Sequence, residues 1–326
     1  MVQTSLQIYQ LKKKKTYSQN WPVYNKYQTE EKMMFLKILN NAVDALEIPY
    51  QYAGGRPHYD LSDLIKCLNI KVFNCFSSRR TNYELQVAYG MEYIKCLPHF
   101  NTLINHMGNP EMTQHLHRLY KILAMPLVDI ENNFAIDATG FSTFNKNRWI
   151  HAKLDWKQVK DFKKLHIISG VRTNIITAAR VTAGKKHDSV FFPDLVRQTS
   201  MNFKMKLISA DAGYLSRQNC NVADDLGIVP YILPREGVTT KGKGSLAWRK
   251  MLYLWETYRP VFEKYYHMRS NVESTFSMIK RKYLPYVRSK SDIAQFNEIL
   301  CKVVCHNASV LVNCVFELGI DLKNLL

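Results

Sequence analysis

The hydrophobic pattern of the chain changes its period near residue 133, and this change limits the folds that the chain can adopt. Residues 1 to about 125 carry apolar side chains at helical spacing, as in TEEKMMFLKILNNAVDAL, with acidic residues in its first turn. From residue 134 onward, FAIDATGFS is a short run of strand type that ends in turn residues. The sequence therefore predicts a helical region followed by a domain that contains a β-sheet.

The segments after this run predict strands that are followed by alternating helices and strands. Strands are expected at RWIHAKL, LHIISGVRT and IITAARVT, then a helix at SVFFPDLVRQT. A strand at KLISADAGY, a helix at SRQNCNVADDLG and a strand at IVPYILP come next, and the chain is helical from about Ser245 onward. This order is typical of an α/β fold with a mixed sheet covered by helices. We expect a helical N-terminal region over residues 1–125, with DNA binding as one possible role, and the α/β domain over residues 126–326.

The charge of the chain points to a polyanionic partner. Among 326 residues, 45 Lys and Arg stand against 27 Asp and Glu, a net charge of +18. Neutralising phosphates releases condensed counterions, so a charge this large favours nucleic acid. Binding to a membrane surface and simple solubility are the alternatives.

The sequence does not predict export or a membrane span. MVQTSLQIYQLKKKKTYSQNW lacks the apolar segment of a secretory signal, and polar residues interrupt CKVVCHNASVLVNCVFELGI. We expect a soluble cytoplasmic protein, in which the seven cysteines are reduced core thiols. A zinc site at Cys301, Cys305 and His306 is the alternative, but the first two are four residues apart beside valines, as buried helix residues are.

Two aspartates lie where a purely structural role is hard to supply. Asp137 interrupts an apolar strand pattern, and Asp211 ends another strand. A carboxylate inside a core strand is costly unless it is paired or binds a metal, and ligands of α/β sheets gather beyond the carboxyl ends of strands. The alternative is that each aspartate caps the turn that follows it.

A third acidic residue, Glu273, stands alone among cations in YYHMRSNVESTFSMIK, residues 265–280. If this segment is one helix at about 100° per residue, Tyr266, Arg269 and Lys280 fall in line with Glu273, beside a buried apolar stripe. An ion-pair ladder is the alternative, but an Arg four residues before a Glu is the weaker orientation. We interpret Glu273 as a metal ligand, with the cations gripping phosphates.

Two strand aspartates and a helix glutamate supply the hard oxygen ligands that Mg²⁺ prefers. Two such ions, about 3.5–4 Å apart, can activate a nucleophile and stabilise the leaving oxygen in phosphoryl transfer. The residues therefore indicate a magnesium-dependent reaction on a phosphodiester.

These residues resemble the DDE transposases of bacterial and archaeal insertion sequences, whose catalytic core is similar to RNase H and retroviral integrase. The spacing Tyr266-x2-Arg269-x3-Glu273-x6-Lys280 matches the Y-(2)-R-(3)-E-(6)-K signature of one large branch. IDATGF and ADAGY look like the segments that carry the first two acidic residues of that branch, and KKHDS resembles a short segment between them.

The resemblance implies an RNase H-like core in which Asp137, Asp211 and Glu273 are the catalytic and metal-binding triad for Mg²⁺, with Mn²⁺ as a substitute. It further implies that the element's double-stranded DNA ends contact Tyr266, Arg269 and Lys280. It also implies a homodimer that pairs two ends, in the prokaryotic cytoplasm at the nucleoid. Only about 62 residues separate the second and third acids, which leaves little room for the large β-insertion of some relatives.

The expected function is that of a transposase that binds terminal inverted repeats, cleaves at the 3′ ends and joins them to target DNA. The alternatives are a metal-dependent nuclease without strand transfer, and a non-catalytic DNA-binding protein derived from a transposase. Asp188 is a rival carboxylate. We predict it to be the N-cap of a helix that starts near Val190, with His187 in the loop before it.

Overall fold

The computed structural model describes residues 20–50, 54, 58–143, 162–184, 187–238 and 244–322. The strand expected at RWIHAKL lies outside these ranges. Helices precede the sheet, as the sequence pattern predicts. The elements before and within the first three strands are α1 (Trp21–Asp44), α2 (Leu61–Phe73), α3 (Asn82–Gly90), α4 (Phe100–Met107), α5 (Pro110–Ala124), η1 (Met125–Leu127), β1 (Asn133–Thr143), β2 (Phe162–Gly170) and β3 (Ile176–Thr182).

The rest of the chain alternates helices and strands and then becomes helical. Its elements are η2 (Asp188–Phe191), α7 (Phe192–Ser200), β4 (Leu207–Ala210), η3 (Ala212–Tyr214), α8 (Arg217–Asp225), β5 (Val229–Ile232), α9 (Leu246–Thr257), α10 (Arg259–Tyr266), η4 (His267–Arg269), α11 (Ser270–Tyr283), β6 (Tyr286–Val287) and α12 (Asp292–Leu318).

The sheet is mixed, and its strand order is β3-β2-β1-β4-β5, with the short β6 pairing β1. β1 pairs antiparallel with β2, and β2 antiparallel with β3. β1 pairs parallel with β4, and β4 parallel with β5. The predicted α/β class is confirmed, and this six-stranded sheet flanked by helices is compatible with an RNase H-like core. The two-residue β6 was not predicted, because a strand that short carries no readable alternation.

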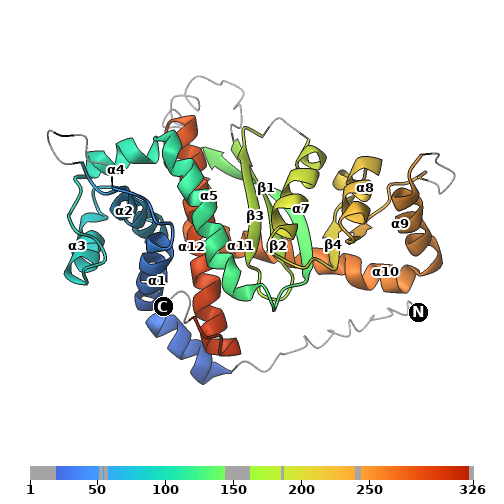
Figure 1. The fold of residues 1–326 in the computed structure, drawn as a ribbon, viewed down its shortest axis with the longest axis horizontal. Coiled ribbons are helices and arrows are strands. Elements are labelled where there is room, and N and C mark those ends of the chain that lie inside the picture. The colour runs from blue at the N-terminus through green and yellow to red at the C-terminus, as the bar shows by residue number, and fades with distance from the viewer. Residues whose placement is uncertain are drawn as a thin grey trace, which may run out of the picture.

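The long helix α12 joins the N-terminal helices to the sheet. It runs between the two groups in Figure 1, while α8, α9 and α10 lie at the far end of the sheet. α12 packs against α1, α2, α5 and β3, and α5 also contacts β3. α11 packs against β1 and β2. One apolar core therefore continues from the N-terminal helices into the sheet.

α12 is 27 residues long and apolar enough to cross a membrane by length and composition, but 83% of its most apolar window is buried inside the protein. Cys301 and Cys305 lie on this helix as buried free thiols. The His306 Nε2 atom is 2.9 Å from the carbonyl oxygen of Asn174, so its contact is to the backbone. These features describe the central core helix of a folded domain.

Asn307 connects α12 to two other elements through buried hydrogen bonds. Its Oδ1 accepts from the Ile176 N–H at 2.9 Å, and its Nδ2 donates to the Ile176 carbonyl at 2.8 Å. The same Nδ2 donates to the Tyr120 carbonyl at 2.9 Å. Backbone groups in the core must be paired, so this one amide satisfies the end of α5 and the start of β3 together.

Replacing this amide tests its role. Asn307→Ala is expected to lower the free energy of unfolding by about 2–5 kcal/mol in urea denaturation, because it leaves the buried Ile176 N–H and carbonyl unpaired and removes a second bond to the Tyr120 carbonyl. The control is Asn313→Ala on the same helix. The Asn313 side chain makes no hydrogen bond within the described residues, so a loss under about 1 kcal/mol is expected. Equal losses in the two variants would contradict the assignment.

Candidate active site

Asp137 and Asp211 lie at the same level of the sheet, where two parallel strands separate. The ladder between β1 and β4 ends at Ala135 and Ser209. Each aspartate is two positions further along its own strand direction. Residues in register on parallel strands stand about 5 Å apart on the same face, so the two carboxylates leave the ladder side by side.

Asp211 also caps the turn that follows it, as the alternative interpretation expected. Its Oδ1 accepts a hydrogen bond of 2.8 Å from the Gly213 N–H. A Cβ atom at residue 213 would lie 2.9 Å from that Oδ1, so a side chain there would displace the Asp211 carboxylate. No described residue donates a hydrogen bond to Oδ2, which leaves this oxygen available to a ligand. The capping and ligand interpretations are therefore compatible.

Two residues that the sequence did not single out hold this turn. The buried Asn219 donates from Nδ2 to the Tyr214 carbonyl at 2.7 Å and to the Ser189 Oγ at 3.0 Å. Arg235 donates from Nε to the Ala212 carbonyl at 3.0 Å. The turn after Asp211 is thus fixed to α8, to the η2 segment and to the loop after β5.

The segment that carries Glu273 is not one continuous helix. α10 ends at Tyr266, a 3-10 turn covers residues 267–269, and α11 starts at Ser270. The Ser270 Oγ donates to the His267 carbonyl at 2.9 Å, and the Asn271 Nδ2 donates to the Met268 carbonyl at 3.0 Å. Short polar side chains that bond back to the backbone compete with regular α-helical bonding. The prediction of a single helix was therefore wrong.

Arg269 connects the first carboxylate to the third. Its Nη1 is 3.4 Å from the Asp137 Oδ2, and its Nη2 is 2.6 Å from the Glu273 Oε1. The exposed fractions of the side chains are 18% for Asp137, 23% for Arg269 and 54% for Glu273. Burial lowers the pKa of Arg269, but Glu273, Tyr266 and Asp137 outweigh this, so that its pKa is raised. The ion pair between Arg269 and Glu273 that the alternative interpretation expected is thus present. Arg269 also pairs with Asp137 on β1.

The electrostatics of Asp137 differ from those of an ordinary surface aspartate. Burial, with help from Asp211 and Glu273, raises the pKa of Asp137 to about 6, although the Ala138 N–H and Arg269 oppose the shift. The Ala138 N–H donates to the Asp137 Oδ1 at 2.8 Å. A bound cation would favour the ionised carboxylate and offset the cost of this crowding.

Lys280 contacts β1, whereas Tyr266 packs in a neighbouring cluster. The Lys280 Nζ donates to the Thr139 Oγ1 at 2.6 Å, and Thr139 shares a face of β1 with Asp137. Burial lowers the pKa of Lys280. Tyr266 packs in a second small core, its ring centroid 6.4 Å from that of Phe262. Lys280 therefore contacts β1, Arg269 contacts both β1 and Glu273, and Tyr266 packs in the neighbouring second core. The three do not lie on one helix.

Asp188 has a different role from the predicted helix cap. The cap is His187, whose Nδ1 accepts from the Ser189 N–H. The Asp188 Oδ2 accepts from the Lys164 Nζ at 2.7 Å, and its Oδ1 is 3.6 Å from the His166 Nδ1. Burial lowers the pKa of His166 to about 4. The sequence could not show this, because the two β2 side chains reach Asp188 only in the folded sheet.

Tyr214 is a further buried group near the carboxylates. It is 1% exposed, and its hydroxyl finds no hydrogen-bond partner within the described residues. Burial, followed by Asp137, Asp188 and Asp211, raises the pKa of Tyr214. The hydroxyl therefore stays protonated beside three acidic groups. Its position in ADAGY, three residues after Asp211, was the available signal in the sequence.

The carboxylates have the right chemistry for a divalent metal, but they are not assembled around one point. Within the described ranges, no three His, Cys, Asp or Glu side chains are grouped closely enough to hold an ion. Asp137 and Glu273 meet through Arg269 instead. Oxygen donors of this kind suit Mg²⁺. Burial and the neighbouring carboxylates raise the pKa of Asp137, and a bound cation would favour its ionised form.

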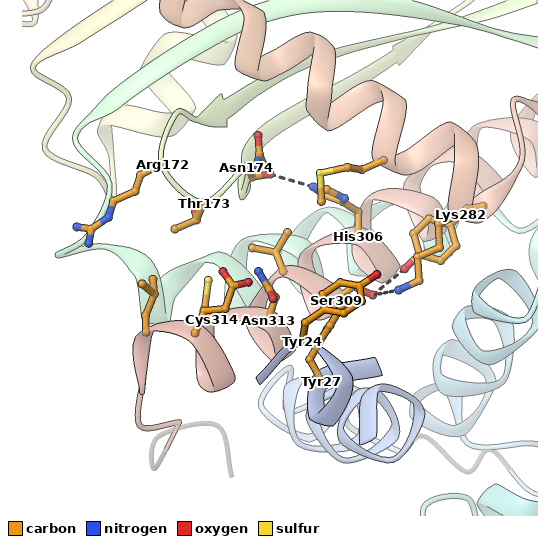
Figure 2. A pocket seen from close by; sticks show the side chains of 15 residues that line it. Tyr24, Tyr27, Arg172, Thr173, Asn174, Lys282, His306, Ser309, Asn313 and Cys314 are labelled. Carbon is orange, nitrogen blue, oxygen red and sulfur yellow. Dashed lines mark hydrogen bonds between the residues drawn. The ribbon is translucent and has the colours of Figure 1, made fainter. Parts of the chain in front are cut away.

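A cavity of about 450 Å³ lies away from these carboxylates. Figure 2 shows Tyr24 and Tyr27 of α1 beside Ser309 and Asn313 of α12, under the turn that joins β2 to β3. Much of its polar lining is already bonded, as in the Lys282 Nζ contact of 3.0 Å to the Ser309 Oγ. None of the predicted site residues lines it.

Residues 131–308, more than half of the chain, match the family model described as the transposase DDE domain. The matched segment contains Asp137, Asp211 and Glu273, and it includes the strands β1 to β6. The chain belongs to this family, and the family places it among the transposases, enzymes that act on DNA. No solved structure matches the chain.

The raised pKa of Asp137 leads to a test in metal-free buffer. A carboxyl with a folded pKa of about 6 and an ordinary unfolded pKa destabilises the fold increasingly as pH rises through 6. Asp137→Asn is therefore expected to have a free energy of unfolding about 2–3 kcal/mol larger than that of wild type at pH 8, as measured by urea denaturation. Near pH 4 the two free energies should be equal.

Asp225→Asn is the control, because Asp225 is exposed at the end of α8. This change is expected to leave the unfolding free energy within about 0.5 kcal/mol of wild type at pH 8. An Asp137→Asn protein that is no more stable than wild type at pH 8 would contradict the electrostatic account.

Proposed function

We propose that this transposase binds the terminal inverted repeats of its element, cleaves at their 3′ ends and joins those ends to target DNA. The observation that carries the proposal is the influence of Asp211 and Glu273 on the partly buried Asp137 carboxylate, whose pKa both of them raise. Asp137 and Asp211 come from adjacent parallel strands, and Glu273 reaches Asp137 through Arg269. Such a set of oxygen donors from separate elements suits phosphoryl transfer.

In this proposal Asp137, Asp211 and Glu273 hold Mg²⁺, with Mn²⁺ as a substitute. When bound, the metal would activate the attacking oxygen and stabilise the leaving one. For the carboxylates to share it, Glu273 must leave Arg269. Glu273 is half exposed, so it loses little packing when it moves. Asp137 and Asp211 are better fixed, since each carboxylate accepts a backbone hydrogen bond of 2.8 Å.

The cations beside the carboxylates would bind the DNA backbone. Arg269, released by Glu273, can offer two parallel N–H donors to one phosphate, whereas Lys280 offers a point charge beside Thr139. Tyr266 can donate its hydroxyl to a phosphate or stack on a base. These three residues would hold the strand, and the carboxylates would orient the reacting oxygens.

The partners follow from charge and symmetry. A net charge of +18 supports binding to double-stranded DNA, both element ends and target. An element has two ends and each chain carries one set of these three carboxylates, so the active complex would be a homodimer that pairs the ends.

The triad can be tested by substitution. Asp137→Ala, Asp211→Ala and Glu273→Ala are each expected to abolish Mg²⁺-dependent cleavage of DNA that borders the gene, while leaving DNA binding largely intact. Because the three would act as a unit, double variants should be little worse than single ones. Gel analysis of end-labelled duplexes separates joined products from cleavage alone and from binding alone.

Asp225→Ala serves as the matched control in this assay, because it removes an exposed carboxylate at the end of α8, away from the proposed site. It should cleave like wild type. Cleavage that survives in Asp137→Ala with Mg²⁺ would refute the proposed chemistry, and cleavage without joined products would leave a nuclease.

The cations give a separate prediction. Arg269→Ala and Lys280→Ala are each expected to weaken cleavage by about 1–3 kcal/mol, roughly 5- to 150-fold in rate, for each lost charged contact. Arg269→Lys should not restore the rate, since lysine lacks the planar pair of donors. Lys250→Ala is the control, because this lysine pairs with Asp224 on the surface. Cleavage per folded molecule that is unchanged in both variants would make these residues structural.

A further inference from the structure

A third strand ends at the edge where Asp211 lies. β5 runs parallel to β4, and their ladder ends at Ala210 and Ile232. Asp211 follows directly on one strand, and Arg235 stands three residues beyond Ile232 on the other. The carboxyl ends of neighbouring parallel strands form the usual ligand-binding edge of a sheet, so Arg235 belongs to the same edge as the proposed catalytic carboxylates.

One side of the Arg235 guanidinium is already anchored. Its Nε donates to the carbonyl of Ala212, the residue after Asp211, at 3.0 Å. The turn that presents this carbonyl is itself fixed by the Asp211–Gly213 hydrogen bond and by the buried amide of Asn219. The position of the guanidinium is therefore set relative to Asp211 before any ligand arrives.

The other side of the guanidinium has no partner among the described residues. The Nη1 and Nη2 atoms of Arg235 make neither a hydrogen bond nor an ion pair there, and the residue is exposed. In contrast, Arg180 and Arg259 form ion pairs with Asp194 and Glu263. An arginine whose Nε is fixed and whose Nη donors are unused can donate two parallel hydrogen bonds to the oxygens of an anion such as a phosphate.

We propose that Arg235 binds one backbone phosphate of the DNA strand that reaches Asp211. This inference rests on the proposed function, because it takes DNA as the ligand of this edge. The hydrogen bond to the Ala212 carbonyl holds the Arg235 cation beside Asp211. Arg269, in contrast, pairs with Asp137 and Glu273. The two arginines would then hold the strand from opposite sides of the carboxylates. The proposed ligand is a phosphate rather than a base edge, because the carboxylates of this edge would act on the DNA backbone and phosphate contacts fix its position.

The test measures binding without divalent metal, so that no strand is cut. Fluorescence anisotropy follows wild type, Arg235→Ala and Arg235→Lys on a labelled duplex that carries the DNA bordering the gene. Arg235→Ala is expected to bind about tenfold more weakly. Arg235→Lys should regain little, because one ammonium group cannot serve both the Ala212 carbonyl and the phosphate in the fixed geometry. Arg197→Ala is the control. Arg197 is an exposed arginine in the last turn of α7, which precedes the amino end of β4, whereas Asp211 follows the carboxyl end of that strand.

A second readout separates phosphate binding from support of the turn. Neutral methylphosphonates replace the phosphates near the cleavage position one at a time. Wild type should lose affinity at one position where Arg235→Ala loses none, since the contact is already gone. A turn support alone would leave the positional pattern of the variant like that of wild type.

Binding by Arg235→Ala equal to that of Arg197→Ala, or an unchanged methylphosphonate pattern, would overturn the inference. The proposed function fails separately. Cleavage by Asp137→Ala would refute the proposed metal chemistry. Weaker DNA binding by Arg235→Ala, with no further loss at one methylphosphonate position, would still establish the phosphate contact.

Discussion

Parallel pairing of β1 with β4 stops after Ala135 and Ser209, and the geometry of the site follows from that point. Two residues further along each strand stand Asp137 and Asp211, so two carboxylates emerge at one level of the sheet. β5 continues the parallel set and brings Arg235 to the same edge. A register shift of one residue on either strand would turn its aspartate to the opposite face.

Like charges held this close oppose folding, and the protein compensates locally. Burial and its acidic neighbours raise the pKa of Asp137 to about 6, while Arg269 and a backbone N–H favour the ionised form. The arrangement is poorer for stability than an apolar strand would be, which is typical of residues that are retained for chemistry. Lys280 adds a second cation through Thr139 on the same strand. The electrostatic balance at this edge is suited to a bound cation and a polyanionic strand.

The fold class could be predicted because periodicity is a local property of the sequence. The strands β1 to β5 and the helices α7 and α8 fall on segments whose apolar residues alternate or repeat at helical spacing. Two features were missed for the same reason. β6 is two residues long, and the 3-10 turn at 267–269 depends on Ser270 and Asn271 bonding back to the backbone. Neither leaves a periodic trace.

The sequence by itself determined the residue types of the site. Asp137 breaks an apolar strand, Asp211 ends one, and Glu273 stands alone among cations. Only the tertiary structure decided which groups meet them. Arg269 reaches Asp137 across 132 residues of chain, Asn219 secures the turn after Asp211, and Arg235 ties to Ala212 over 23 residues. Such contacts depend on which strands pair and in what register, and that is set by packing of the whole core rather than by any local pattern.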